Sequence, residues 1–195
     1  MNTNDLVEWQ RIDLENGFIE PWLTWPFMDW VKTLDLSNKR ILEFGAGRST
    51  AWWRKKSKWV DSIESNSEWA HQAIKDCYLN ELPNGQVYYQ DLCDGMATTE
   101  LTRYMALLPP YNQPYDIIII DGIYRTEMVE WSINHLKANG GGYLFIDNLD
   151  QDFVWISPRA MELVSGLEGE VFIQPEHINH EGKPWNTRYY EIPKT

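Results

Sequence analysis

The stretch Arg40-Ile-Leu-Glu-Phe-Gly-Ala-Gly-Arg-Ser-Thr50 decides the fold of this chain. It predicts a short apolar strand, then a glycine turn, then a helix that Ser49 or Thr50 caps. Gly45 and Gly47 lack a Cβ and can adopt positive φ, so a ligand can lie against their backbone. A strand, a glycine turn and a helix in this order are typical of a site for a nucleotide-type cofactor.

Two details of this turn distinguish between cofactors. A dinucleotide fingerprint, G-x-G-x-x-G, needs a third glycine where this chain has Thr50. Glu43 stands two residues before the first glycine, where a carboxylate suits a cationic group such as an ammonium better than a pyrophosphate. The alternative is a purely structural turn between a strand and a helix.

Acidic residues also end the next predicted strands, namely Glu64, Asp91, Asp121 and Asp147. Glu64 follows the first acid by about 20 residues, the spacing at which a carboxylate reaches ribose hydroxyls. The alternative for Glu64 is a solvated acid at a strand end. Ligands of parallel sheets bind outside the carboxyl ends of the strands, so these acids predict one polar site at that edge.

Strand and helix patterns alternate along the chain and predict an α/β fold, a doubly wound Rossmann-like sheet with helices on both faces. The strands are expected near 40–44, 59–63, 86–90, 115–121, 142–147, 170–174 and 187–192. The helices are expected near 50–57, 67–80, 96–107, 126–138 and 156–166, with Thr126 as a candidate cap. We expect a single domain over 1–195, with an aromatic, helical lead-in at 1–38 and the core at 39–195.

The composition indicates a compact acidic protein. The chain has 195 residues, is 43% hydrophobic and carries a formal net charge of −12. Because no basic run is present, we expect neither nucleic acid nor a membrane as a partner. The two cysteines, Cys77 and Cys93, form no metal-binding or disulfide pattern, which favours a cytoplasmic location.

Taken together, these motifs resemble the class I S-adenosylmethionine-dependent methyltransferases. The segment from Leu42 to Thr50 resembles their motif I, whose acid-x-Gly-x-Gly loop wraps the methionine moiety. Pro21-Trp-Leu-Thr-Trp-Pro-Phe and Ile120-Asp-Gly-Ile-Tyr-Arg125 are similar to segments of small bacterial and viral methyltransferase-like proteins. The resemblance implies a seven-stranded, mostly parallel sheet in the order 3-2-1-4-5-7-6, with an antiparallel last strand. It implies S-adenosylmethionine as cofactor, held by Glu43, Gly45, Ala46, Gly47, Ser49, Thr50, Glu64, Ser65, Asp91 and Asp121.

A narrower resemblance raises the question of a metal. Catechol O-methyltransferase-like enzymes hold a divalent ion on an Asp after strand four and an Asp-Asn pair after strand five. Asp121, Asp147 and Asn148 stand at those positions, and their oxygens suit Mg²⁺. Those enzymes also have a lysine base where this chain has Tyr124, so an alternative remains in which the two aspartates cap loops or orient the substrate.

Methyl transfer to oxygen needs alignment of the reacting atoms and a base for the hydroxyl. The candidate catalytic residues are Asp121, Asp147, Arg125 and two histidines, His177 and His180, on a loop expected at 175–186. The histidines could equally be a polar loop tip. Arg125 could hold an anionic group of the substrate, or pair with Glu127 or Glu130.

We therefore expect an S-adenosylmethionine-dependent methyltransferase that acts on a small molecule, at oxygen. A protein or peptide methyltransferase and a non-catalytic S-adenosylmethionine-binding module are the alternatives. Trp22 and Trp25 lie between two prolines, which predicts a rigid aromatic loop that could cover the cofactor. Whether the chain forms a homodimer stays open.

Overall fold

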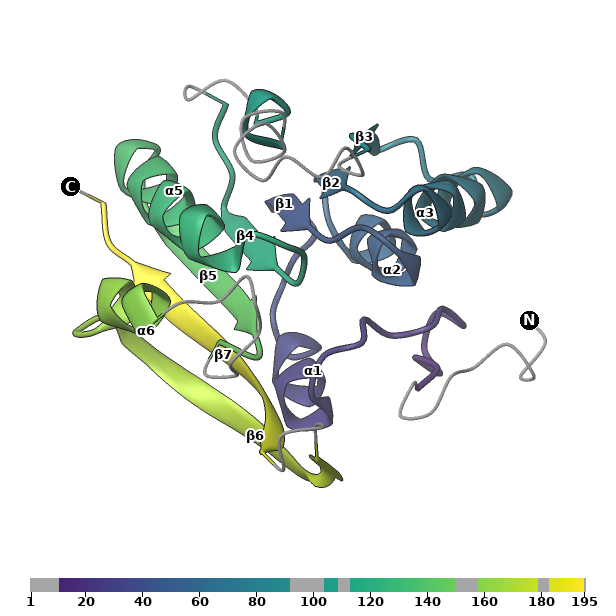
Figure 1. The fold of residues 1–195 in the computed structure, drawn as a ribbon. Helices are drawn as coiled ribbons and strands as arrows, with labels where there is room; N and C mark the ends of the chain where they lie inside the picture. Colours follow the sequence, from purple (N-terminus) through teal and green to yellow (C-terminus); the bar gives the residue numbers. More distant parts are fainter. Residues whose placement is uncertain (1–10, 92–103, 109–112, 150–157, 179–182, 195) are drawn as a thin grey trace.

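The computed structural model describes residues 11–91, 104–108, 113–149, 158–178 and 183–194 (Figure 1). Within these residues, seven strands form one sheet in the order β3-β2-β1-β4-β5-β7-β6. The strands from β1 to β5 pair in parallel, and β7 runs antiparallel to both β5 and β6. The predicted fold class and strand order are confirmed.

The observed elements follow the predicted pattern closely in the first half of the sheet. The strands are β1 (Arg40–Phe44), β2 (Trp59–Glu64), β3 (Gly85–Tyr89), β4 (Ile117–Ile120), β5 (Gly142–Asp147), β6 (Glu168–Ile178) and β7 (Pro184–Ile192). The helices are α1 (Trp25–Val31), α2 (Arg48–Lys56), α3 (Ser67–Leu79), α5 (Arg125–Ala138) and α6 (Pro158–Val164). Most of the helix expected at 96–107 lies outside the described residues. Each helix in the described part is too short or too polar to cross a bilayer.

The centre of the sheet is built from aliphatic residues because both of its faces are covered. The strand β4 consists of four isoleucines, all buried, as a central parallel strand requires. Leu42 and Phe44 of β1 point to a core shared with α5 and α6, whereas Ile41 points to a core shared with α1, α2 and α3. Figure 1 shows these two helical layers on either side of the sheet. Because β1 to β5 run in parallel, the acids at the ends of these strands lie at one edge of the sheet, the carboxyl edge.

The lead-in differs from its prediction, because α1 is its one helix in the described part. The segment 11–24 instead forms an irregular strap with a single bridge between Ile12 and Ile19. Thr126 also differs from its prediction: it lies inside α5, and Tyr124 precedes the helix with a left-handed φ of 53°.

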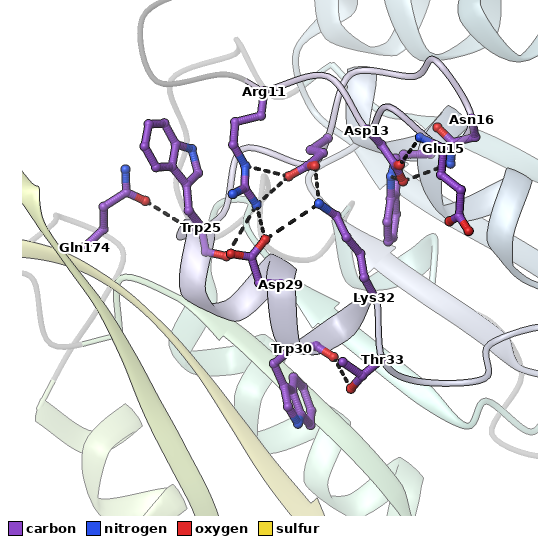
Figure 2. Close-up of polar contacts among 12 residues, drawn as sticks. Arg11, Asp13, Glu15, Asn16, Trp25, Asp29, Trp30, Lys32, Thr33 and Gln174 are labelled. Carbon is purple, nitrogen blue, oxygen red and sulfur yellow. Dashed lines mark hydrogen bonds and ion pairs between the residues drawn. The ribbon is translucent and has the colours of Figure 1, made fainter.

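Ion pairs rather than helical bonds hold this strap in place (Figure 2). Arg11 pairs with Glu20 and with Asp29 of α1, each at 2.8 Å. Lys32 pairs with the same Glu20. Because Glu20 is buried between these two cations, the strap is fastened to the end of α1 and close to the carboxyl edge of the sheet.

The loop predicted at 175–186 is shorter than expected. The strand β6 continues to Ile178, which pairs with Pro184 at the start of β7. Antiparallel neighbours can continue their hydrogen-bonded ladder beyond the apolar residues of a strand. The apolar pattern at 170–174 therefore predicted a strand that is too short. His177 therefore lies in β6 and not in a loop.

Candidate functional site

A cavity of about 420 Å³ lies at the carboxyl edge of the sheet. Its walls come from the turns after three strands: 45–49 after β1, 64–66 after β2 and 121–123 after β4. Glu20 and Trp22 of the lead-in strap also line it. This is the position at which parallel sheets bind ligands, as the sequence predicted.

Most of the residues predicted to bind a cofactor do line this cavity. Seven of them are wall residues: Gly45, Ala46, Gly47, Ser49, Glu64, Ser65 and Asp121. Glu43, Thr50 and Asp91 are not among the described residues that form the wall. Asp91 is exposed beyond the end of β3.

The two glycines of the turn have different roles. Gly45 has a φ of +99°, and a Cβ there would lie 2.7 Å from the carbonyl carbon of Asp121. The backbones at the ends of β1 and β4 therefore touch, which only glycine allows. Gly47 has an extended φ of −177°, and a Cβ there would meet the ring of Trp69 at 3.4 Å, an ordinary contact. The expectation of positive φ is met only at Gly45.

Glu43 stabilises the glycine turn after β1 through hydrogen bonds. Its carboxylate accepts hydrogen bonds from Ser49 Oγ at 2.5 Å, Thr50 Oγ1 at 2.7 Å and Ser62 Oγ at 2.7 Å. Burial raises the pKa of this carboxyl, and the three hydroxyl donors oppose the shift. In this structure Glu43 thus contacts hydroxyls of the fold, in place of the direct ligand contact that the sequence suggested. Thr50 has the same bracing role, because it also accepts the N–H of Gly47 at 3.2 Å.

Glu64 is held in one orientation at the cavity wall. Its Oε1 accepts the backbone N–H groups of Ser65 and Asn66, both at 2.7 Å. Asn66 in turn caps α3, so the start of that helix and the carboxylate are positioned together. Burial raises the pKa of Glu64, which these two hydrogen bonds oppose. A preorganised carboxylate of this kind suits a ligand that presents hydroxyl donors.

Asp121 and Asp147 share one cation, Arg125. The Nη2 of Arg125 lies 3.3 Å from Oδ1 of Asp121, and its Nη1 lies 4.0 Å from Oδ2 of Asp147. The guanidinium also donates to the backbone oxygen of Gly122 at 2.9 Å, and to that of Asp147. Arg125 thus pairs with neither Glu127 nor Glu130, the partners considered from the sequence. Desolvation, together with the charge of Asp147, raises the pKa of Asp121 well above its usual range.

Asp147 is buried and fastens β5 to β7. Trp185 Nε1 donates to both carboxylate oxygens at 3.0 Å, and Thr187 Oγ1 donates at 2.8 Å. Asn148 donates through its amide nitrogen. Burial raises the pKa of Asp147 to about 6. Asp147 is 2% exposed and is not among the described residues that line the cavity. Its hydrogen bonds therefore stabilise the fold next to the cavity.

The described residues do not fit a magnesium site at Asp121, Asp147 and Asn148. Both oxygens of Asp147 already accept hydrogen bonds, and the guanidinium of Arg125 lies within ion-pair distance of both carboxylates. The Asn148 amide faces Asp147 through nitrogen, and its oxygen accepts from the backbone of Asn186 at 3.3 Å. Hard cations need free oxygen lone pairs. Across the described residues, no cluster of three or more His, Cys, Asp or Glu side chains could hold a metal.

Neither histidine is among the described residues that line this cavity. His177 belongs to β6, the edge strand three places from β4 in the sheet, and its side chain lies outside the described part. His180 lies outside the described residues altogether. A catalytic role for either one stays a prediction.

Aromatic side chains complete the cavity, and the sequence identified only part of them. Trp22 lines it and packs edge-on against Trp185 with ring centroids 5.7 Å apart. Trp69 of α3 and Tyr104 also line it. Trp69 ends the segment 62–69, which resembles the small methyltransferase-like proteins, whereas Tyr104 belongs to no motif and reaches the cavity through the packing of the segment at 104–108. Aromatic faces beside acidic side chains favour a planar or cationic ligand.

The buried carboxyl of Asp147 makes stability depend on pH. Its pKa is about 6 in the folded state against an ordinary 3.8, so folding retains a proton that the unfolded chain releases. The stabilisation is complete below about pH 4 and is lost as the pH rises through about 6. We expect Asp147→Asn to flatten this part of the Tm–pH profile, measured by circular dichroism. A variant that keeps the wild-type slope between these values would contradict the assignment.

Comparison with known proteins identifies the fold. No protein-family model and no curated protein matches this sequence. Among solved structures, the O-methyltransferase TomG from Streptomyces achromogenes, in complex with SAM, is similar with 18% identity and a TM-score of 0.51. The match covers 78% of this chain and 73% of TomG.

Two other solved structures cover more of the chain. TYW2 from M. jannaschii, in complex with AdoMet, has 14% identity, a TM-score of 0.59 and coverage of 97% of this chain and 89% of its own. A proposed rRNA methylase from Clostridium thermocellum has 9% identity and a TM-score of 0.59, covering 87% of this chain and 96% of its own. The shared feature of these structures is the fold of class I S-adenosylmethionine-dependent methyltransferases, which is also the fold of this chain.

Proposed function

We propose that this chain, which has the class I methyltransferase fold, transfers the methyl group of S-adenosylmethionine to an oxygen of a small molecule. The observation that carries the proposal is the cavity at the carboxyl edge of the sheet. There the glycine turn after β1, the fixed carboxylate of Glu64 and the carboxylate of Asp121 meet. Similar folds hold this cofactor in TomG and TYW2.

The charges of the cavity agree with this cofactor. Glu64 and Asp121 line it, and the buried Glu43 adds its field from behind the turn. S-adenosylmethionine carries an ammonium and a sulfonium, whereas a dinucleotide carries a negative pyrophosphate. Arg48 and Arg125 also line the cavity, beside the acids Glu20, Glu64 and Asp121. Three acids against two arginines favour the cationic ligand over the pyrophosphate.

Asp121 is the base in the proposed reaction. Bound in the cavity, S-adenosylmethionine supplies an electrophilic methyl carbon on its sulfonium. Asp121 accepts the proton of the attacking hydroxyl, and its raised pKa brings its basicity closer to neutral pH. Arg125 contacts Oδ1 of Asp121 and thereby orients the carboxylate. Trp22 is one of the residues that line the cavity.

A small-molecule acceptor is favoured over nucleic acid by charge. The chain carries a net charge of −12, which repels a polyanion. Similar folds include both TomG, an O-methyltransferase, and a proposed rRNA methylase, so the fold by itself does not choose between acceptors. A protein or peptide acceptor and a non-catalytic binding module are the competing functions.

Calorimetric titration with S-adenosylmethionine, and with NAD as the comparison ligand, tests the cofactor. Binding of the first and not of the second is expected. Methyl transfer to a panel of hydroxyl compounds, peptides and RNA then tests the acceptor. Turnover on peptides or RNA but not on hydroxyl compounds would redirect the proposal, and tight cofactor binding without turnover on the whole panel would favour the binding module.

Glu64→Ala is expected to weaken binding of S-adenosylhomocysteine by about one to two orders of magnitude. The loss of charge-assisted hydrogen bonds from the ribose to this carboxylate is the reason. Calorimetry measures the change. Glu68→Ala is the matched control, because Glu68 lies on an exposed face in the first turn of α3 and is not among the described wall residues. Equal affinities for the two variants would refute the role given to Glu64.

A further inference from the structure

A second cavity lies at the opposite edge of the sheet from the proposed active site. It has a volume of about 520 Å³ and is formed by the end of α2, the end of α3 and the start of β3. Most of its wall is apolar, with contributions from Ile74, Tyr78, Leu82, Pro83 and Val87. Because β3 begins here and ends at the carboxyl edge, the two cavities are separate.

One cationic side chain, Arg54, is built into the wall of this cavity. Arg54 is 7% exposed, and its Nη1 donates to the backbone oxygen of Leu82 at 3.2 Å. Its Nε and Nη2 are buried and have no hydrogen-bond partner among the described residues. A buried guanidinium with unsatisfied donors is costly, and proteins almost always satisfy such groups.

The fold makes room for this guanidinium. A Cβ at Gly85, the first residue of β3, would lie 2.9 Å from Nε of Arg54, so the arginine packs directly on the strand backbone. Asn84 donates to the backbone oxygen of Arg54 at 2.8 Å and holds that turn of α2. Glu81 also lines the cavity but is exposed at its rim, where water solvates it.

We propose that this second cavity binds a small amphipathic carboxylate, with its carboxylate on Nε and Nη2 of Arg54 and its apolar body on the wall. The two donors without a protein partner form one edge of the guanidinium, and a carboxylate accepts from such an edge in a bidentate way. The apolar wall matches a hydrocarbon or aromatic body, and a single buried cation matches a single negative charge. This inference does not depend on methyl transfer.

The test uses octanoate as the probe, titrated calorimetrically into the full chain saturated with S-adenosylhomocysteine. We expect saturable binding with one site, and at least about tenfold weaker binding of octanamide, which has the same body without the charge. Arg54→Met should weaken octanoate binding about tenfold or more. Lys55→Met, which removes the neighbouring exposed charge of the same helix, should leave it unchanged.

Three results would overturn the inference: no saturable binding of octanoate at millimolar concentration, equal binding of octanoate and octanamide, or unchanged binding to Arg54→Met. The Tm of Arg54→Met shows whether that variant folds. The octanoate and octanamide comparison on the wild-type chain decides the question even if the variant does not fold.

Discussion

Asp121→Asn is expected to lower kcat for methyl transfer by about 10²–10⁴-fold, the usual contribution of a general base. Asparagine keeps the shape of the side chain but cannot accept the proton of a substrate hydroxyl. Affinity for S-adenosylhomocysteine should change little, because Ser65, Glu64 and the glycine turn that line the same cavity are intact. The result to measure is a separation of catalysis from binding.

Rate measurements across pH sharpen this test. In the wild type the rate should fall as the pH drops through the raised pKa of Asp121, because the base is then protonated. The variant should lose this acid limb. Asp116→Asn is the matched control, since Asp116 precedes the same strand at its other end and contacts Arg40 and Lys39. A kcat for Asp121→Asn equal to that of the control would exclude Asp121 as the base.

Gly45→Ala is expected to abolish cofactor binding and to lower Tm by about 10 °C or more. The positive φ alone costs a non-glycine residue about 1–3 kcal/mol. The added Cβ would also lie 2.8 Å from both the oxygen of Asp121 and the nitrogen of Gly122, and backbone cannot move aside without opening β1 from β4. For a domain of this size a few kcal/mol correspond to several degrees in Tm.

Gly47→Ala is the matched control for this prediction. Gly47 has an extended φ, and its added Cβ would contact only a ring edge of Trp69 at 3.4 Å. Its Tm should therefore stay close to that of the wild type, measured in the same thermal scans. Similar losses of Tm in the two variants would show that the two glycines are not distinguished by backbone geometry.

Local pattern was sufficient for much of the fold. The isoleucine run of β4 and the apolar strand β5 can be recognised from the sequence, because a strand buried on both faces must be apolar along its whole length. The position of the cavity could also be predicted from local pattern. The glycine turn and the acids mark the ends of strands in the sequence, and the cavity lies at those strand ends. The order of the strands came from resemblance, since pattern alone does not choose neighbours.

Long-range contacts explain the predictions that failed. The strap at 11–24 depends on ion pairs with α1, and the extension of β6 depends on pairing with β7. Neither has a periodic signature in its own segment. The partners considered as an alternative for Arg125 were Glu127 and Glu130 of its own helix, but its partners in the structure lie at the ends of β4 and β5.

The sequence by itself determined the α/β class, the glycine turn and the acids that surround the cavity, because each follows from residues close together in the chain. Only the tertiary structure decided which acids face a ligand and which support the fold. The carboxylates of Glu43 and Asp147 accept hydrogen bonds from hydroxyl and indole groups of the fold, whereas Glu64 and Asp121 line the cavity. The same contacts pair Arg125 with Asp121 and Asp147, the two acids considered for a metal. Burial and partner geometry set these roles, and both depend on contacts between distant segments.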